Sequence, residues 1–461
     1  MEGLEITVCN WADFTKDNAY IRLDSEYQDK ERLEIVNKLK GIGAERFGEG
    51  DPVIVHPHEI TRSYVGTEGV WFFRAQNIRP MSINSSNKVF ISIDDAESLS
   101  RNALKNGDVV ITRTGANAGD CALFSANETV LASSHTFIVR APYWSHYYLV
   151  TFLNTNYGRR QILSSRYGAA QPEVSPYYLR NIWIPRFNDD FYERIERCFL
   201  EAERLKNSAL SSLEFSESIL LRALGLNDWH APEPLTYVRS SHDAFSAGRL
   251  DAEYFTPRVT ALLKQLGRDH LTIADVAPAR HEKFKTDEQG DTFRYIEIGS
   301  VNSDGMAEAN EISTVDAPSR ASQYVKRGDV ITSTVRPIRR LSALVTEEHD
   351  GDVCSSGFVV LQPRKISGPT LLTYLKLPPV CELMDLHTSA SLYPAISEKD
   401  LLALPIPRIP EDIQKKIDTK VEEARSAKQR AIQLLDAAKR AVEIAIEQDE
   451  KSALAFLESY S

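Results

Sequence analysis

One uninterrupted helical pattern runs through residues 188–225, which read NDDFYERIERCFLEAERLKNSALSSLEFSESILLRALG. Neither glycine nor proline occurs between positions 189 and 224. Small and apolar residues, with one lysine among them, recur at alternating spacings of four and three, as in the seam of a coiled coil. The seam holds Ile195, Phe199, Ala202, Lys206, Ala209, Leu213 and Leu220. The spacing therefore predicts a long helix that packs against a similar partner.

The partner is expected in the same chain, because the seam recurs 222 residues later within residues 409–450. Six of ten compared seam positions are identical in the two stretches, including the lysine. The second seam holds Ile417, Val421, Ala424, Lys428, Ala431, Leu435 and Val442. Either helix alone is typical of the core of its own domain. Two matched seams instead favour an antiparallel pair about 50 Å long, in which both lysines extend their ammonium groups outward.

Shorter repeats show that the whole chain is duplicated. RLDSEY at 22–27 recurs as RLDAEY at 249–254, Gly-Asp-Val at 107–109 recurs at 328–330, and Ile-Pro-Arg at 184–186 recurs at 406–408. Their order is kept while the offset changes by only a few residues. Short β-rich runs such as 108–112, 136–139 and 358–361 precede each long helix, with helical stretches such as 147–163 between them. We therefore expect two copies of an α+β domain with a mostly β core.

These patterns divide the chain into seven segments. The expected segments are an N-terminal segment (1–21), a first α+β domain (22–187), a first long helix (188–225), a linker (226–248), a second α+β domain (249–408), a second long helix (409–450) and a C-terminal tail (451–461).

Composition places the protein among soluble, cytoplasmic chains. It has 461 residues, a net charge of −11 and five scattered cysteines without a C-x-x-C pair. The beginning of the chain lacks the apolar core of a secretory signal, and no stretch approaches the roughly 20 apolar residues of a membrane span. Such cysteine usage suits a reducing compartment.

Common catalytic motifs are absent from the sequence. It lacks a P-loop, the H-E-x-x-H and G-x-S-x-G motifs, the Pro-Pro-aromatic clamp of a DNA amino-methyltransferase and a convincing nuclease constellation. His56-Pro57-His58 is interpreted as part of a surface loop rather than a metal site. Asp24 and Asp251 are interpreted as helix N-caps. We therefore expect neither a catalytic centre, nor a metal site, nor a bound cofactor.

Positive charge is concentrated in two windows. Residues 131–187 contain six arginines and one acidic residue, and residues 319–346 contain six basic residues and one aspartate. Such windows suit contacts with phosphates, although an ordinary solvated face is the alternative. Within or near them, arginine can read guanine and asparagine can read adenine. The candidate DNA-binding residues are Arg74, Gln76, Arg113, Asn117, Arg166, Tyr167, Gln171, Lys283, Lys285, Arg336, Arg339 and Arg340.

The ordered, duplicated set of motifs resembles the specificity subunit of type I restriction–modification enzymes. The matching marks are the two RLD-x-EY openings, Gly-Asp-Val before each basic loop, and YGAAQPEVS at 167–175 ahead of Ile184-Pro185. The second copy departs from this pattern, with SASLYP at 389–394. The resemblance implies two target-recognition domains, an antiparallel coiled coil acting as a spacer, and no catalysis by this chain.

The resemblance also implies partners. Each recognition domain would read half of a split, asymmetric double-stranded DNA site. Two methyltransferase subunits would dock on the long helices with S-adenosylmethionine, and a motor-nuclease subunit would bring ATP and Mg²⁺. Three alternatives stay open at this point: a specificity-like subunit of another phage-defence or DNA-modification complex, a fused enzyme, and a purely structural adaptor.

Overall fold

The computed structural model describes residues 22, 24–61, 63–85, 88–168, 170–231, 233–286, 290–302, 304–389 and 394–460. The expected N-terminal segment 1–21 and positions 390–393 of the second-copy SASLYP stretch lie outside the described residues. The chain divides into two compact units. Met1–Arg204 and Arg430–Ser461 form the first unit, and Leu205–Gln429 forms the second.

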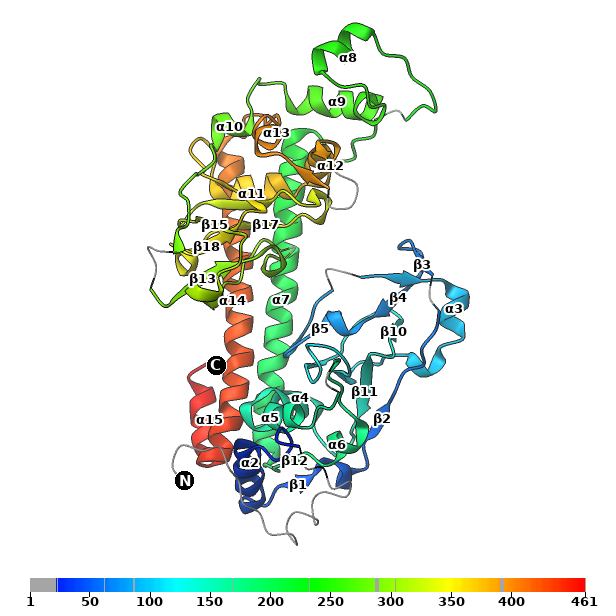
Figure 1. Ribbon diagram of the computed structural model, residues 1–461, viewed down its shortest axis with the longest axis vertical. Coiled ribbons are helices and arrows are strands. Elements are labelled where there is room, and N and C mark those ends of the chain that lie inside the picture. The colour runs from blue at the N-terminus through cyan, green and yellow to red at the C-terminus, as the bar shows by residue number, and fades with distance from the viewer. Residues whose placement is uncertain are drawn as a thin grey trace. The chain divides into compact units, whose positions relative to one another are not determined.

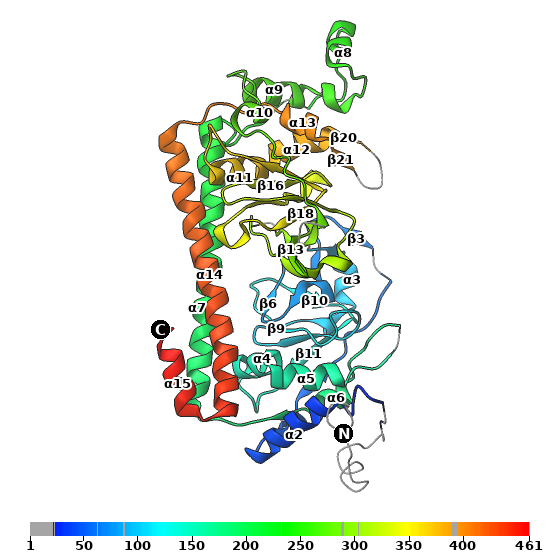
Figure 2. The same ribbon diagram turned by 60° about the vertical axis from the view of Figure 1, so that its left-hand side comes forward.

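Two long helices, α7 (Asp189–Leu224) and α14 (Glu411–Glu447), each contribute one part to both units. Within each unit these parts lie side by side (Figures 1 and 2). In the second unit, Leu220 near the end of α7 shares a hydrophobic cluster with Ile417 near the start of α14. In the first unit, Arg194 near the start of α7 pairs with Glu458, which follows α14. The two helices therefore run antiparallel, which confirms the predicted pairing.

The predicted seam is mostly buried. Its members that are less than a tenth exposed are Ile195, Phe199, Ala202, Ala209, Leu220, Ile417, Val421, Ala424, Ala431, Leu435 and Val442. Leu213 and both seam lysines are half-buried. The expectation that Lys428 extends into solvent is wrong, because its ammonium group forms an ion pair with Asp304 of the second α+β domain. A loop of that domain covers the position.

The α+β domain of the first unit contains two four-stranded sheets. One has the order β2-β11-β8-β9 and the other has the order β10-β4-β7-β3. The strands in these sheets are β2 (Val53–Val55), β3 (Tyr64–Val65), β4 (Val70–Phe73), β7 (Phe90–Ile91), β8 (Val109–Thr112), β9 (Cys121–Leu123), β10 (Val130–Ala132) and β11 (Thr136–Arg140). The short pairs β1 (Glu45–Arg46) with β12 (Trp183–Ile184) and β5 (Ile78–Arg79) with β6 (Ser82–Ile83) complete it.

The second unit shares the central strand order of both sheets, which are β17-β16-β19 and β14-β13-β18-β15, and differs at their edge strands. In both units one parallel strand pair joins segments far apart in sequence, β4 with β10 and β13 with β18. The strands are β13 (Thr292–Ile296), β14 (Asn310–Ser313), β15 (Ala321–Tyr324), β16 (Val330–Ser333), β17 (Ser342–Leu344), β18 (Val353–Ser355), β19 (Phe358–Leu361), β20 (Thr388–Ser389) and β21 (Ala395–Ile396). The shared strand pairing confirms the duplicated α+β fold that the repeats predict.

A pair of helices follows the sheets in each copy. The helical stretch expected over 147–163 is two helices, α4 (His146–Asn154) and α5 (Asn156–Ser164). Thr155 separates them, because it ends α4 and its hydroxyl caps α5. The second copy has α11 (Gly368–Lys376) and α12 (Pro378–Leu386), where prolines start α12. The remaining helices of the α+β domains are α2 (Lys30–Gly41), α3 (Ile93–Glu97), α6 (Pro176–Arg180), α9 (Pro257–Leu266), α10 (Ile273–Val276) and α13 (Glu398–Leu402).

The expected linker and tail both contain helical structure. A short helix, α8 (Ser241–Ala247), lies within the linker 226–248. Leu226, the first residue of the linker, belongs to the core of the second unit. The tail 451–461 is mostly the helix α15 (Glu450–Glu458), which buries Ala453 and Leu457. The sequence of neither segment has the periodicity needed to predict its helix.

Leu220→Ala tests how far the second unit depends on the helix seam. Leu220 is fully buried, so the substitution should lower the free energy of unfolding by about 2–5 kcal/mol. Leu210→Ala is the matched control, since Leu210 lies on the same helix but is 51% exposed. Denaturant unfolding of the isolated chain measures both. Equal effects of the two substitutions would contradict the seam.

Candidate nucleic-acid interface

The repeated Gly-Asp turn is structural in both copies. Asp108 is buried and accepts two hydrogen bonds of 2.8 Å from the guanidinium of Arg140. Asp329 is buried and accepts bonds of 2.7 and 3.0 Å from Arg280. Each aspartate is thus neutralised by a bidentate arginine, which compensates for the burial of its charge. The turn fixes the strand from which each basic loop emerges.

The repeated Arg-x-Asp opening ties each copy to the end of a helix. The guanidinium of Arg22 donates to the carbonyl of Ser165 at 2.8 Å, beyond α5, and that of Arg249 donates to the carbonyl of Leu386 at 2.7 Å, in α12. A cation at a helix C-terminus also interacts favourably with the helix dipole. Asp24 and Asp251 pair with these arginines.

The expectation that Asp24 caps a helix is therefore wrong. Its carboxylate accepts a 3.0 Å bond from Tyr27 N within a turn, while the nearby helix α2 is capped by Asp29. Asp251 likewise precedes a 3-10 turn rather than an α-helix, because α9 begins only at Pro257 with Thr256 as its cap.

Two loops of seven residues, 113–119 and 334–340, project from equivalent strands. Each loop is closed by a 2.8 Å backbone bond, Thr112 N to Asp120 O in one and Ser333 N to Leu341 O in the other. Each also pairs with the segment that follows the helix pair, through a bridge from Thr114 to Glu173 and from Val335 to Ala395. The two copies therefore hold a loop of the same length against an equivalent supporting segment, which follows the helix pair.

In the first unit, this support gathers five of the predicted DNA-binding residues. Asn117 lies on the loop, Tyr167 and Gln171 lie on the adjoining segment, and all three are exposed. Arg166 is half-buried and donates to the carbonyl of Ala116 at 3.5 Å. Loops that a rigid scaffold holds in place in this way often carry the binding residues of a protein.

The fifth residue, Arg113, is held on several sides. Its Nε donates to the Glu173 carboxylate at 2.7 Å, and one terminal nitrogen contacts His56 Nε2 at 2.6 Å and donates to the carbonyl of Ser134 at 3.2 Å. That Arg113 itself reads a base stays a prediction.

Arg113 also lines an open pocket of about 500 Å³. Its lining residues are His56, Pro57, His58, Glu59, Arg101, Arg113, Ser134 and His135. Buried Asn102 holds the His56–His58 loop through bonds of 2.9 and 3.0 Å to the backbone of His58. Desolvation and the nearby Arg113 charge lower the pKa of His56 below its usual value. The H-P-H stretch is interpreted from the sequence as a surface loop, and no local sequence pattern indicates that Arg101 and His135 line the same pocket.

In the second unit, the three loop arginines have different surroundings. Arg339 is exposed and Arg336 is half-buried. Arg340 instead forms an ion pair with Glu217 of α7, so its guanidinium anchors the loop to the long helix. This ion pair gives Arg340 a structural role that competes with its predicted role as a DNA contact.

The remaining candidates lie on other segments. Arg74 follows β4 and faces the Tyr64 ring, with 5.9 Å from its Cζ to the ring centre, and Gln76 is exposed in the following turn. Lys283 and Lys285 are exposed beside β15. None of these four residues belongs to the two loops.

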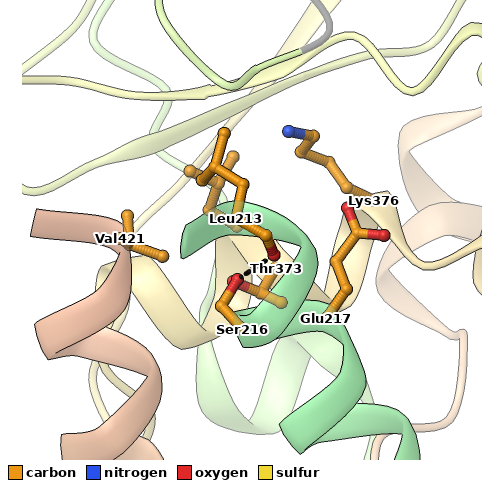
Figure 3. Close-up of a pocket in the computed structure, with 7 residues that line it drawn as sticks. Leu213, Ser216, Glu217, Thr373, Lys376 and Val421 are labelled. Atoms are coloured by element: carbon orange, nitrogen blue, oxygen red, sulfur yellow. Dashed lines mark hydrogen bonds between the residues drawn. The ribbon is translucent and has the colours of Figure 1, made fainter. Parts of the chain in front are cut away.

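A buried lysine lies where α11 meets the long helices. Figure 3 shows Lys376 beside Glu217 of α7, at a pocket of only about 10 Å³ that Val421 of α14 also lines. Lys376 is 4% exposed, and this burial lowers its pKa to about 8, although Glu217 and Asp304 act in the opposite direction. Glu217 and Asp304 have their own cations in Arg340 and Lys428. Ionic contacts therefore join the second domain to both helices.

No group of three or more His, Cys, Asp or Glu side chains within the described ranges is arranged to hold a metal ion. Cys121, Cys198, Cys354 and Cys381 are buried free thiols, and burial raises the pKa of each. Among the described helices, none combines the length and apolar character needed to cross a membrane.

The chain is similar to solved structures over 90% of its length. The S subunit of a type I restriction-modification system from M. genitalium matches with 16% identity, a TM-score of 0.37 and 95% of its own chain covered. The HsdS subunit from Thermoanaerobacter tengcongensis matches with 15% identity, a TM-score of 0.26 and 95% covered. A chain from a type I R-M system structure matches with 16% identity, a TM-score of 0.27 and 96% covered. No protein-family model and no curated protein matches the sequence.

Lys376→Met should stabilise the second unit at pH 7. The folded state holds the lysine with a lowered pKa, so keeping it charged below pH 8 opposes folding. Replacing it should raise the free energy of unfolding by about 1–3 kcal/mol at pH 7. Above pH 8 the folded lysine loses its proton before the unfolded one does, so wild-type stability rises and the difference narrows.

Denaturant unfolding of both proteins at pH 7 and pH 9 measures this difference. Lys416→Met is the matched control, since Lys416 lies on α14 with its side chain 62% exposed. A Lys376→Met variant that is less stable than wild type at pH 7 would contradict the interpretation of Lys376 as a destabilising buried cation. A stability difference between the two proteins that widens at pH 9 would contradict it as well.

Proposed function

We propose that this chain is the non-catalytic DNA-specificity subunit of a type I restriction–modification complex. Each α+β domain serves as a target-recognition domain for one half of a split, asymmetric site. The antiparallel helices join the two domains and set the unread gap between the half-sites. Methylation and cleavage belong to partner subunits, which carry S-adenosylmethionine, ATP and Mg²⁺.

The observation that carries this proposal is the contrast between the two loops. Residues 113–119 read RTGANAG and residues 334–340 read TVRPIRR, although both leave equivalent strands and rest on equivalent segments. Catalytic loops in a duplicated enzyme would keep their reacting residues in both copies. Loops that read two different base sequences must differ, because each base pair presents its own pattern of donors and acceptors in the major groove.

Charge around the loops suits DNA. Residues 319–346 contain six basic residues and one aspartate, with three of the arginines on the second loop, and residues 131–187 of the first domain contain six arginines and one glutamate. The ion pairs of Arg113 and Arg340 hold loop backbones in place. Exposed Arg339 and Asn117 then start from fixed backbones, which limits the conformational entropy lost on binding.

Partner docking is supported by exposed apolar side chains on the long helices. Leu200 of α7 and Ile432 of α14 are 47% and 45% exposed in the first unit, and Leu210 and Phe215 of α7 are each 51% exposed in the second. Exposed apolar side chains on otherwise polar helices are typical of protein interfaces. One methyltransferase subunit per unit fits this distribution.

The deciding experiment is a genome-wide map of N6-methyladenine in the host, with and without this gene. The strain must express the partner methyltransferase. Loss of methylation at one split, asymmetric motif is the expected result. An unchanged map would refute the type I function, and association with an unrelated defence complex would then become the leading interpretation.

Arg339→Ala should weaken DNA binding by the assembled complex to a similar degree for all target variants. An exposed loop arginine that contacts a phosphate contributes affinity without sequence information. The slope of log affinity against log salt should therefore fall by about one unit. Binding titrations at several salt concentrations measure the change.

Arg327→Ala provides the control for that titration. Arg327 belongs to the same basic window, but its side chain is 68% exposed and pairs with Glu347. Its substitution should leave the salt slope unchanged. Equal slopes for wild type and Arg339→Ala would remove Arg339 from the interface.

A further inference from the structure

The seven-residue loops can be aligned position by position through their backbone bonds. Gly115 N donates to Pro172 O at 3.0 Å, and Arg336 N donates to Pro394 O at 2.8 Å. Ala118 N donates a 3.0 Å hydrogen bond to Gly115 O, and Arg339 N donates one of the same length to Arg336 O. Gly115 is therefore equivalent to Arg336, and the same spacing makes Gly119 equivalent to Arg340.

Both equivalent pairs adopt left-handed backbone. Gly115 and Gly119 have φ angles of 99° and 96°, whereas Arg336 and Arg340 have φ angles of 50° and 60°. Glycine takes this conformation without penalty, but the Cβ of any other L-residue meets the following carbonyl oxygen. The second loop thus keeps the shape of the first while placing arginines where that shape favours glycine. Strained residues of this kind cluster at functional sites.

Arg340 has a structural reason to be an arginine, because it anchors the loop through Glu217. The glycine at its equivalent position is required by packing, since a Cβ on Gly119 would lie 2.6 Å from Ile162. Gly115 differs, because a Cβ there would have no heavy atom within 4 Å. The position shared by Gly115 and Arg336 therefore has room for a side chain in the first copy and carries one in the second.

We propose that this shared position determines specificity, with Arg336 reading a guanine of the second half-site and Gly115 leaving the equivalent base of the first half-site unread. The inference rests on the proposed function and adds the residue and base involved. A guanidinium donates two parallel hydrogen bonds to guanine O6 and N7 in the major groove. Such a bidentate contact requires a defined direction, which a flexible surface arginine lacks.

The loop supplies that direction. The N–H and carbonyl groups of Arg336 are both engaged by the bonds that align the two loops, and Pro337 restricts the next φ angle. The residue is half-buried rather than exposed. Contact with a phosphate would need none of this, because phosphates accept hydrogen bonds from any exposed arginine nearby. The strained, braced backbone therefore favours base reading.

Arg336→Gly tests the inference in the assembled methyltransferase complex. Glycine relieves the left-handed strain, so the melting temperature should stay the same or rise. Discrimination at a single guanine of the second half-site should fall by about 5- to 150-fold, the contribution of one good bidentate contact. Methylation of a library in which each base of the motif is randomised in turn measures this discrimination. Arg336→Asn is the second variant, because asparagine tolerates left-handed backbone better than most residues.

Gly115→Arg is the reciprocal test. The open space at Gly115 should accommodate the side chain with some backbone strain, because the φ angle there is 99°. The first half-site should gain a preference for guanine at one position that wild type does not discriminate. Gly119→Arg is the matched control, since contact with Ile162 should destabilise the first unit without creating a new preference.

The outcomes separate the inference from the function on which it rests. If wild type directs methylation to a split motif but both Arg336 variants keep the same requirement at every base, Arg336 does not read a base. Uniform weakening at all sequences would assign Arg336 to a phosphate and equally overturn the inference. If wild type directs no methylation, the proposed function itself fails.

Discussion

Burial of two matched helix seams is the constraint on which the rest of the structure depends. Neither α7 nor α14 belongs to a single compact unit, because one part of each helix lies in the first unit and the rest lies in the second. In the second unit, Leu220 and Ile417 lie in the same hydrophobic cluster as the helices of the α+β domain. The seam is therefore part of the domain core as well as a connection between domains.

Repetition and difference separate structure from function in this chain. Residues that repeat, such as Asp108 and Asp329 or Arg22 and Arg249, are bound within the protein and hold strands and helix ends. Residues that differ lie on the two projecting loops, whose backbone bonds are the same. A duplicated scaffold keeps its fold by preserving internal partners. Under the proposed function, exposed loop side chains such as Asn117 and Arg339 give the two domains different specificities, while Arg113 and Arg340 brace the loops.

The two loops are braced by different electrostatic contacts. The first depends on Arg113, which contacts Glu173 and His56 of its own domain. The second depends on Arg340, which reaches Glu217 on α7, while Lys428 of α14 reaches Asp304. The second domain is therefore tied to the helices by charge, and buried Lys376 lies among these groups. Breaking one partner of such a buried contact is more damaging than replacing the whole contact with apolar groups.

The sequence by itself determined the duplication, the two long helices with their seam, and strands such as β8, β11 and β19. These features depend on local periodicity and turn chemistry, which are readable within a few residues. Only the tertiary structure decided that Lys428 and Arg340 are ion-paired, that Asp24 caps a turn, and that Arg113 lines a histidine pocket. The partners in three of these contacts are 57, 123 and 124 residues apart in the chain. No local pattern encodes such distant pairs, because their geometry exists only after the sheets and helices have packed.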